Sequence, residues 1–130
     1  MQDRPNVDEL LEAVAGFLHD DVMPNTAGRL SFHARVAGNV IQMLRRELMW
    51  EEDTLDREWA GLDALLGPAA KPARLSELRA ATIARNEELV RRIQSGDADS
   101  GEWQAAVLQH LRASLRDKLA VSNPALVAEG

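Results

Sequence analysis

Apolar residues recur at the spacing of an α-helix along almost the whole of this 130-residue chain, and this periodicity constrains the fold most strongly. No segment alternates apolar and polar residues for long enough to indicate a β-strand. Five amphipathic helices are predicted, over about residues 7–23, 29–50, 54–66, 76–95 and 100–122. Because the connections are short, neighbouring helices are expected to run antiparallel. The sequence therefore predicts an all-α fold, a four- to five-helix antiparallel bundle.

Turn-forming and capping residues mark the expected helix ends. Asn6 followed by Glu9 is a capping signal for the first helix. Gly67 and the proline after it end the third helix, and Gly96 supplies a left-handed cap for the fourth. The termini, about residues 1–5 and 124–130, are expected to be loose.

Length and composition narrow the class of protein. A chain of 130 residues is expected to form one domain, here a single helical domain over residues 1–130. It has no cysteine, which excludes disulfides, thiolate nucleophiles and cysteine-bound metals. Its formal net charge of −6 argues against non-specific nucleic-acid binding. No apolar run reaches the ~20 residues of a membrane span, so we expect a cytoplasmic protein with neither nucleic acid nor membrane as partner.

The segment at about residues 29–50 has the widest apolar arc of the chain, covering about half of the helix circumference. Such an arc implies several neighbouring helices. We therefore expect this helix to be the central and most buried element of the bundle. The arc contains Phe32, Val36, Ala37, Val40, Ile41, Met43, Leu44 and Leu48.

Three polar side chains along one edge of that arc are candidate ligand-binding residues. Arg35 and Arg46 flank Asn39 there, and two guanidinium groups beside an amide suit a phosphate or a carboxylate. His33, which lies inside the arc, is a fourth candidate. Alternatively, the two arginines pair with acids on a neighbouring helix and Asn39 bonds to a backbone carbonyl.

Other polar residues on apolar stripes are candidates for structural roles. Asp21 falls in the last turn of the first helix, where the helix dipole disfavours a negative charge. An ion pair with Arg29 or Arg35 would offset this cost. Glu47 lies inside the arc of the central helix, about 20 Å from His33, so the two cannot form one catalytic pair. Asn86 borders the stripe of the fourth helix and is expected to fix its register.

Known catalytic patterns are scarce in this sequence. It contains no zinc-binding His-Glu-x-x-His helix and no paired Glu-x-x-His ligands of a di-iron bundle, so we expect no metal or other cofactor and identify no catalytic residues. The crowded acids Glu47, Glu51, Glu52 and Asp53 resemble the magnesium sites of helical nucleotide pyrophosphohydrolases. The second acidic pair of those sites is not evident. A magnesium-dependent hydrolase at Glu47–Asp53 is thus a remote alternative.

Several strings of residues resemble a bacterial family of short helical proteins of unknown function. They are Met1–Pro5, Phe32–Ala37 with Asn39, Arg46–Leu48, and Lys118–Val121 with Asn123–Pro124. Members of that family are typically found beside aminoglycoside-phosphotransferase-like kinases and acyl-CoA dehydrogenases. The family's ending continues with a basic residue and an aromatic one, whereas this chain has Ala125 and Leu126. The resemblance implies an accessory module for such an enzyme and supplies no catalytic residues.

The favoured prediction is a non-enzymatic accessory protein that binds a kinase-like enzyme, an acyl-CoA-metabolising enzyme or a second copy of itself. Trp50, Trp59 and Trp103 are candidate interface anchors, because tryptophan dominates the energetics of many interfaces. The alternative is a small anionic ligand held in the bundle by Arg35, Asn39 and Arg46.

Overall fold

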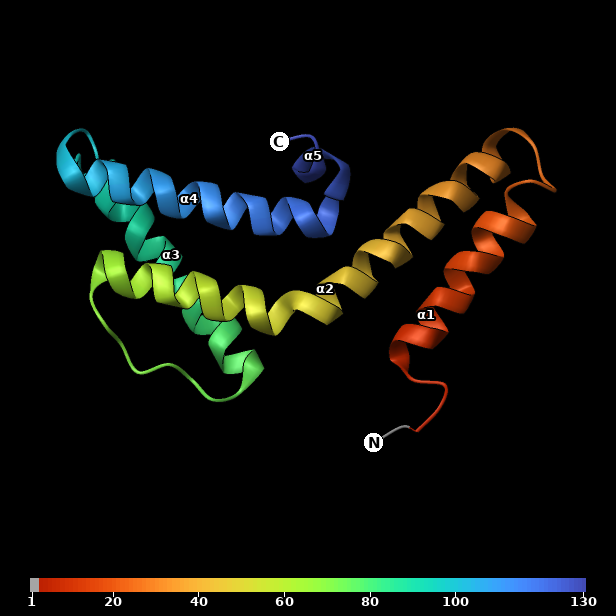
Figure 1. Cartoon of the computed structure of the whole chain (residues 1–130), viewed down its shortest axis with the longest axis horizontal. Coiled ribbons are helices and arrows are strands. Elements are labelled where there is room, and N and C mark those ends of the chain that lie inside the picture. Colours follow the sequence, from red (N-terminus) through yellow and green to blue (C-terminus); the bar gives the residue numbers. More distant parts are fainter. Residues whose placement is uncertain (1–2) are drawn as a thin grey trace. The chain divides into compact units, whose positions relative to one another are not determined.

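The computed structural model describes residues 3–130, and all of its regular elements are helices (Figure 1). This confirms the all-α fold. The chain divides into two compact units, Met1–Met49 and Trp50–Gly130, and α2 contributes to both. The elements are α1 (Val7–Gly16), the π-helical segment η1 (Phe17–Val22), α2 (Gly28–Leu66), α3 (Leu75–Gln94), α4 (Gly101–Ser122) and α5 (Pro124–Ala128).

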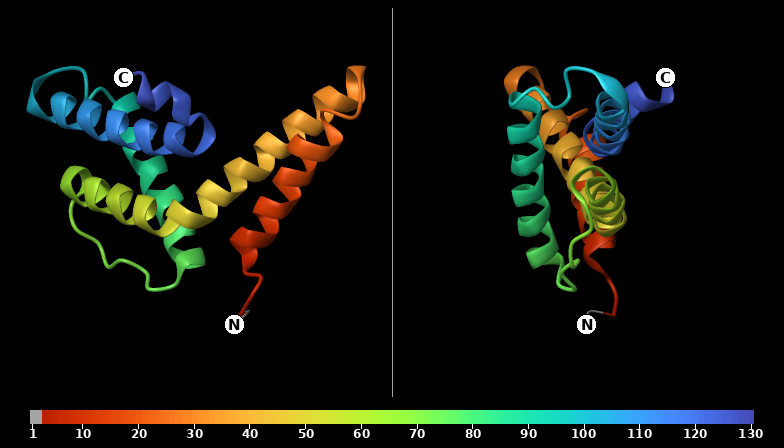
Figure 2. Two further views of the ribbon diagram at one scale, coloured as in Figure 1. Left: turned by 45° about the vertical axis from the view of Figure 1, so that its right-hand side comes forward. Right: turned by 90° about the vertical axis from the view of Figure 1, so that its left-hand side faces the viewer.

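The first unit is a hairpin of two antiparallel helices. Figures 1 and 2 show α1 lying along the first half of α2. Asp8 near the start of α1 is bonded to Arg45, whereas His19 in η1 lies against Gly38. A Cβ atom at Gly38 would lie 2.3 Å from His19 Nε2. The absence of a side chain at this position therefore lets η1 approach α2 closely.

We call α1 together with η1 the first helical segment. Side chains form hydrogen bonds with free backbone groups at both of its ends. The Asn6 side chain accepts from the Glu9 amide at 2.9 Å, and the Glu9 carboxylate accepts from the Asn6 amide, so the predicted capping box is present. Beyond η1, Asn25 Nδ2 donates to the Asp21 carbonyl and Thr26 Oγ1 donates to the Val22 carbonyl, both at 2.7 Å. These bonds replace the ones that a helix loses at its end.

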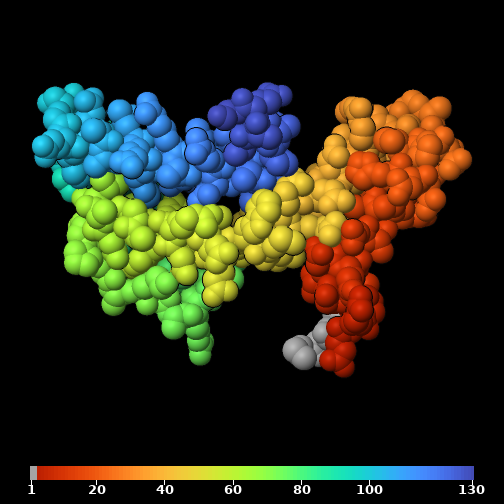
Figure 3. All heavy atoms as spheres, viewed as in Figure 1, coloured from red at the N-terminus to blue at the C-terminus, as the bar shows by residue number. Residues whose placement is uncertain are grey.

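The second unit packs residues 50–66 of α2 against α3 and α4. Its core consists of Leu62, Leu65, Leu89 and Val107. Figure 3 shows side chains of α2 and α4 filling the space between these helices. Arg57 pairs with Asp117 and Trp103 Nε1 donates to the Leu65 carbonyl, so α4 runs antiparallel to α2.

The pair formed by α2 and α3 runs parallel, which contradicts the prediction for neighbouring helices. Three hydrogen bonds join the two helices, from Arg79 to Glu51, from Asn86 to Glu58, and from Arg92 to the Leu65 carbonyl. The residue numbers of both partners increase from one bond to the next, so the two helices run in the same direction. To run parallel to residues 50–66 of α2, α3 must begin near residue 50, so the connector 67–74 has to return along the length of those 17 helical residues, about 25 Å. Eight extended residues can span about 27 Å, which is enough.

Two predicted helix boundaries are wrong. Residues 29–50 and 54–66 form the single helix α2, because the acids between them do not break a helix and no proline interrupts it. Thr54 lies inside α2, where its hydroxyl donates to the Glu51 carbonyl at 3.0 Å. The segment after Asn123, expected to be loose, forms α5 with Pro124 at its first position, where proline is favoured.

The first half of α2 is also far less buried than predicted. Of its described residues from Gly28 to Met49, only Ala34 and Gly38 are buried. The wide apolar arc has one neighbouring helix within its own unit, α1, and the rest of the arc faces outward. His33 and Asn39, expected to be enclosed, are both exposed.

Candidate interaction surface

The apolar stripe of α2 in the hairpin is largely open to solvent. Ala34, with only 3% of its surface exposed, marks the side of α2 that contacts α1. The stripe lies about 40–160° around the helix from Ala34, counted at ~100° per residue. Its members are Leu30, Val36, Val40, Leu44 and Leu48, each 40–60% exposed.

The first helical segment carries a matching stripe. Ala15 is fully buried and marks the side that contacts α2. The stripe lies about 80–160° around from Ala15, in the same rotational sense as the stripe of α2. Its members are Val7, Leu10, Val14 and Phe17, each 44–57% exposed.

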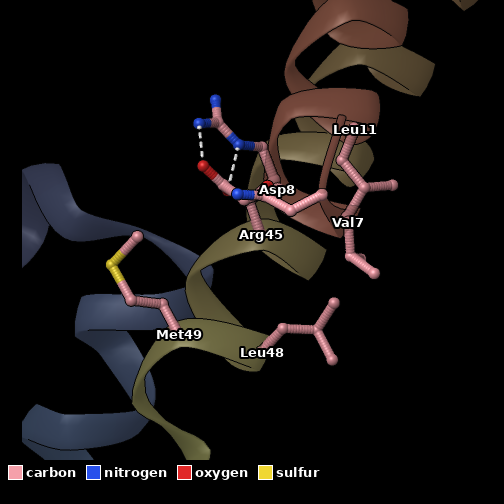
Figure 4. Close-up of a pocket in the computed structure, with 7 residues that line it drawn as sticks. Val7, Asp8, Leu11, Arg45, Leu48 and Met49 are labelled. Atoms are coloured by element: carbon pink, nitrogen blue, oxygen red, sulfur yellow. Dashed lines mark hydrogen bonds and ion pairs between the residues drawn. The ribbon is translucent and has the colours of Figure 1, made fainter. Parts of the chain in front are cut away.

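Both stripes lie on the same side of the hairpin. Each angle is measured about the helix axis, starting from the side that contacts the other helix and viewed along the direction of the chain. In two antiparallel helices, equal angles of the same sense point to the same side of the pair. Figure 4 shows the consequence at one end, where Val7, Leu11 and Leu48 point to one side and the Asp8–Arg45 pair lies on the other. The nine residues of the two stripes therefore form one continuous surface, which we call the hairpin face.

A groove of about 410 Å³ opens at this end of the hairpin. Arg45 donates two hydrogen bonds to the Asp8 carboxylate, from Nε at 2.7 Å and from Nη2 at 2.9 Å. These bonds lower the pKa of Asp8 and raise that of Arg45. With its charges paired, the groove offers mainly apolar surface. It is lined by Asn6, Val7, Asp8, Leu11, Arg45, Leu48 and Met49.

The candidate ligand-binding residues occupy the outside of α2. Arg29 Nε donates to His33 Nε2 at 3.2 Å, and the Arg35 guanidinium lies over the Phe32 ring, 5.5 Å from its centroid. Arg35 also borders a shallow depression of about 280 Å³ beside Phe32. Asn39 is exposed and Arg46 is partly buried. Arg35, Asn39 and Arg46 therefore lie on the surface of the hairpin rather than inside a bundle.

The candidate structural residues have mixed outcomes. Asp21 is exposed, and among residues 3–130 no ion pair joins it to Arg29 or Arg35. Solvent around Asp21 removes the need for that pair. Glu47 is exposed beside the apolar stripe of α2. Asn86 Nδ2 donates to Glu58 Oε1 at 2.8 Å and to the Thr82 carbonyl at 3.1 Å, and so connects α3 to α2.

Two of the three tryptophans belong to the core of the second unit rather than to an exposed interface. Trp59 is 5% exposed, and the Arg85 guanidinium stacks on its ring at 4.7 Å. Trp103 packs against the core cluster, with the Arg92 guanidinium 4.2 Å from its centroid. Trp50 is partly buried.

Sequence reasoning missed His110, the most enclosed histidine of the chain. Its ring lies against Gly61, where a Cβ atom would be 2.2 Å from Nδ1, and its Nε2 is buried without a hydrogen-bond partner among the described residues. Burial lowers the pKa of His110, which nearby Glu58 partly opposes and Lys118 reinforces. The signal was available, because His110 is in helical register with the apolar residues Trp103 and Val107.

The acidic cluster gives no support to the hydrolase alternative. Glu51 is engaged by Arg79, whose Nε donates to it at 2.6 Å. In the described part of the chain, no three histidine, aspartate or glutamate side chains are placed to hold a metal ion. None of the helices over residues 3–130 is long and apolar enough to cross a membrane.

Comparison with known proteins gives one match. The profile of the family described as "Domain of unknown function (DUF6285)" matches residues 24–126. No curated protein and no solved structure matches the chain. The matched residues include all of α2, α3 and α4. The chain therefore belongs to the DUF6285 family, whose function is unknown.

Proposed function

We propose that this protein is a helical accessory protein that acts by binding other polypeptide chains, with the hairpin face as its principal contact surface. The observation that carries the proposal is the half-exposed state of all nine residues of that face. Soluble monomers rarely expose apolar patches beyond a few hundred Å², and larger ones mark interaction sites. A protein-binding surface accounts for this arrangement.

The hairpin also lacks a core of its own. Among its described residues, only the alanines Ala15 and Ala34 and the glycine Gly38 are buried. Chains of this size are marginally stable even when they bury a full core. Covering the exposed half of one valine or leucine contributes about 1 kcal/mol. The eight valines and leucines of the face, together with Phe17, therefore give the hairpin a strong tendency to bind an apolar surface.

The enzyme that this protein serves is proposed from the family resemblance. A kinase of the aminoglycoside-phosphotransferase type or an acyl-CoA dehydrogenase would be the partner, and the protein would contribute contact rather than catalysis. The acidic cluster and the polar edge of α2 do not need a catalytic role in this proposal, since Glu51 is already paired and Asn39 is solvated.

A binding assay with the full chain tests the proposal. The tagged protein is mixed with the purified kinase-like enzyme, with the acyl-CoA dehydrogenase and with untagged copies of itself. We expect a complex with at least one of the three. The double variant Val36→Glu/Leu44→Glu should weaken it at least tenfold, because it buries carboxylates in the contact.

The matched control is Asn39→Glu, which adds a carboxylate to an exposed position of the same helix outside the hairpin face. It should bind like the unaltered protein. Failure to bind all three chains, or equal binding by the double variant, would contradict the proposed function.

A further inference from the structure

We propose that a second copy of this chain covers the hairpin face, so that two hairpins join into an intermolecular four-helix bundle. This inference rests on the proposed function, because it names the chain that occupies the same surface. Two antiparallel hairpins that each present one apolar face can bury both faces against each other in such a bundle.

The charges on α2 make its outer side complementary to itself. Of the four arginines in residues 29–46, only Arg29 lies in the direction of the apolar stripe, at the same end as His33. Glu47 lies at the other end of the stripe. Two α2 helices packed antiparallel would bring the basic end of each against Glu47 of the other.

We place the two-fold axis that relates the two α2 helices at Val40, perpendicular to both helices. Residues equally distant from Val40 then lie opposite each other in the two copies. Val36 meets Leu44, and His33 meets Glu47, while Val40 meets itself. All five residues lie within about 40° of the direction of Val40 on the helix, so a single packed stripe contains them.

The first helical segment fits the same axis. Asp8 pairs with Arg45 and His19 contacts Gly38, so the residues opposite Val40 within one hairpin lie between these two contacts. Val14 and Phe17 occupy that region and belong to the hairpin face. The axis therefore brings apolar residues of both helices of each hairpin together.

Cysteine cross-linking tests the position of the axis. The chain has no cysteine, so a single Val40→Cys substitution gives one unique thiol. Mild oxidation should link most of the Val40→Cys protein into a covalent dimer, because a residue on the axis lies next to its own copy. Asn39→Cys is the control, one residue away and about 100° around the helix. Equal cross-linking of the two variants, or none at Val40→Cys, would overturn the proposal.

Exchange of charges tests the antiparallel contact independently. His33→Glu places a carboxylate opposite Glu47, and Glu47→Arg places a guanidinium against Arg29, which donates to His33. Each variant should therefore weaken self-association about tenfold. The double variant places opposite charges face to face and should recover the original affinity to within about threefold. Additive weakening in the double variant would overturn the proposed alignment.

The outcomes also separate this inference from the proposed function. A protein that stays monomeric but binds one of the enzymes through the hairpin face would overturn the dimer and leave the proposed function standing. A protein that binds neither enzyme nor itself would overturn both.

Discussion

At the scale of single residues, Gly61 and His110 show how one contact sets the distance between two helices. The His110 ring occupies the space that a side chain at position 61 would need. Glycine in a helix normally costs about 1 kcal/mol relative to alanine. The close packing of α2 and α4 at this point offsets that cost.

Gly61→Ala should therefore destabilise the protein by about 1–2 kcal/mol, because the added methyl group overpacks a buried contact. In a His110→Ala background the ring is absent, and Gly61→Ala should instead stabilise by up to about 1 kcal/mol through helix propensity. Urea unfolding of the unaltered protein, the two single variants and the double variant measures the coupling between positions 61 and 110. The same effect of Gly61→Ala in both backgrounds would contradict the role given to this contact.

The lowered pKa of His110 predicts that stability falls on mild acidification. In the unfolded chain this histidine takes up a proton near its ordinary pKa of about 6.5, whereas the buried ring in the folded protein resists protonation. The unfolded state therefore binds more protons below that pH, and the free energy of unfolding decreases as pH falls.

His110→Gln should remove this part of the pH dependence. The loss attributable to His110 is at most about 1.4 kcal/mol per pH unit. Urea unfolding at pH 7.5 and pH 5.5 for both proteins isolates it, because His19 and His33 remain in each. Parallel pH profiles would show that His110 is not the titrating group.

At the scale of helices, Arg85 holds the end of α2 against α3. Its Nη2 donates to the carbonyls of Leu62 at 3.2 Å and Gly67 at 2.6 Å, and its Nη1 pairs with Asp63. Gly67 directly follows the last residue of α2, so its carbonyl has no partner within the helix. Arg85 of the neighbouring helix supplies that partner.

Arg85→Met keeps the apolar stem and removes the donors, so it should cost about 1–3 kcal/mol in stability. Arg79→Met is the matched control on the same helix. Its ion pair with Glu51 lies nearer to solvent, and exposed pairs contribute about 0–1 kcal/mol. Thermal and urea unfolding compare the two variants, and equal losses would contradict the special role of Arg85.

Local signals in the sequence predicted most helix ends but not how the helices pack against one another. Asn6, Gly67 and Gly96 mark observed ends because capping depends on neighbouring residues. The parallel pairing of α2 with α3 depends on how the connector 67–74 extends, and no periodicity encodes that. The apolar arc at residues 29–50 was identified correctly, but its burial was not, since amphipathicity indicates only that a surface is to be covered. The bond between Arg45 and Asp8 joins residues 37 apart in the sequence and had no local signal.

At the scale of the whole molecule, the chain consists of two units that differ in how much apolar surface they bury. Residues 50–130 have a core built from three helices, whereas the described residues of the first unit form a hairpin whose apolar face is exposed. An exposed face of this kind explains how the most apolar helical arc of the sequence can lie outside a core. It is the surface that a second copy of the chain would cover in the proposed dimer.

The mass of the protein in solution, measured by light scattering over a range of concentrations, tests the central claim most directly. We expect twice the chain mass of 14.3 kDa, shifting to the single mass in the Val36→Glu/Leu44→Glu variant. A mass of one chain at every concentration, with residues 1–49 stably folded, would contradict the claim that another copy covers the hairpin face.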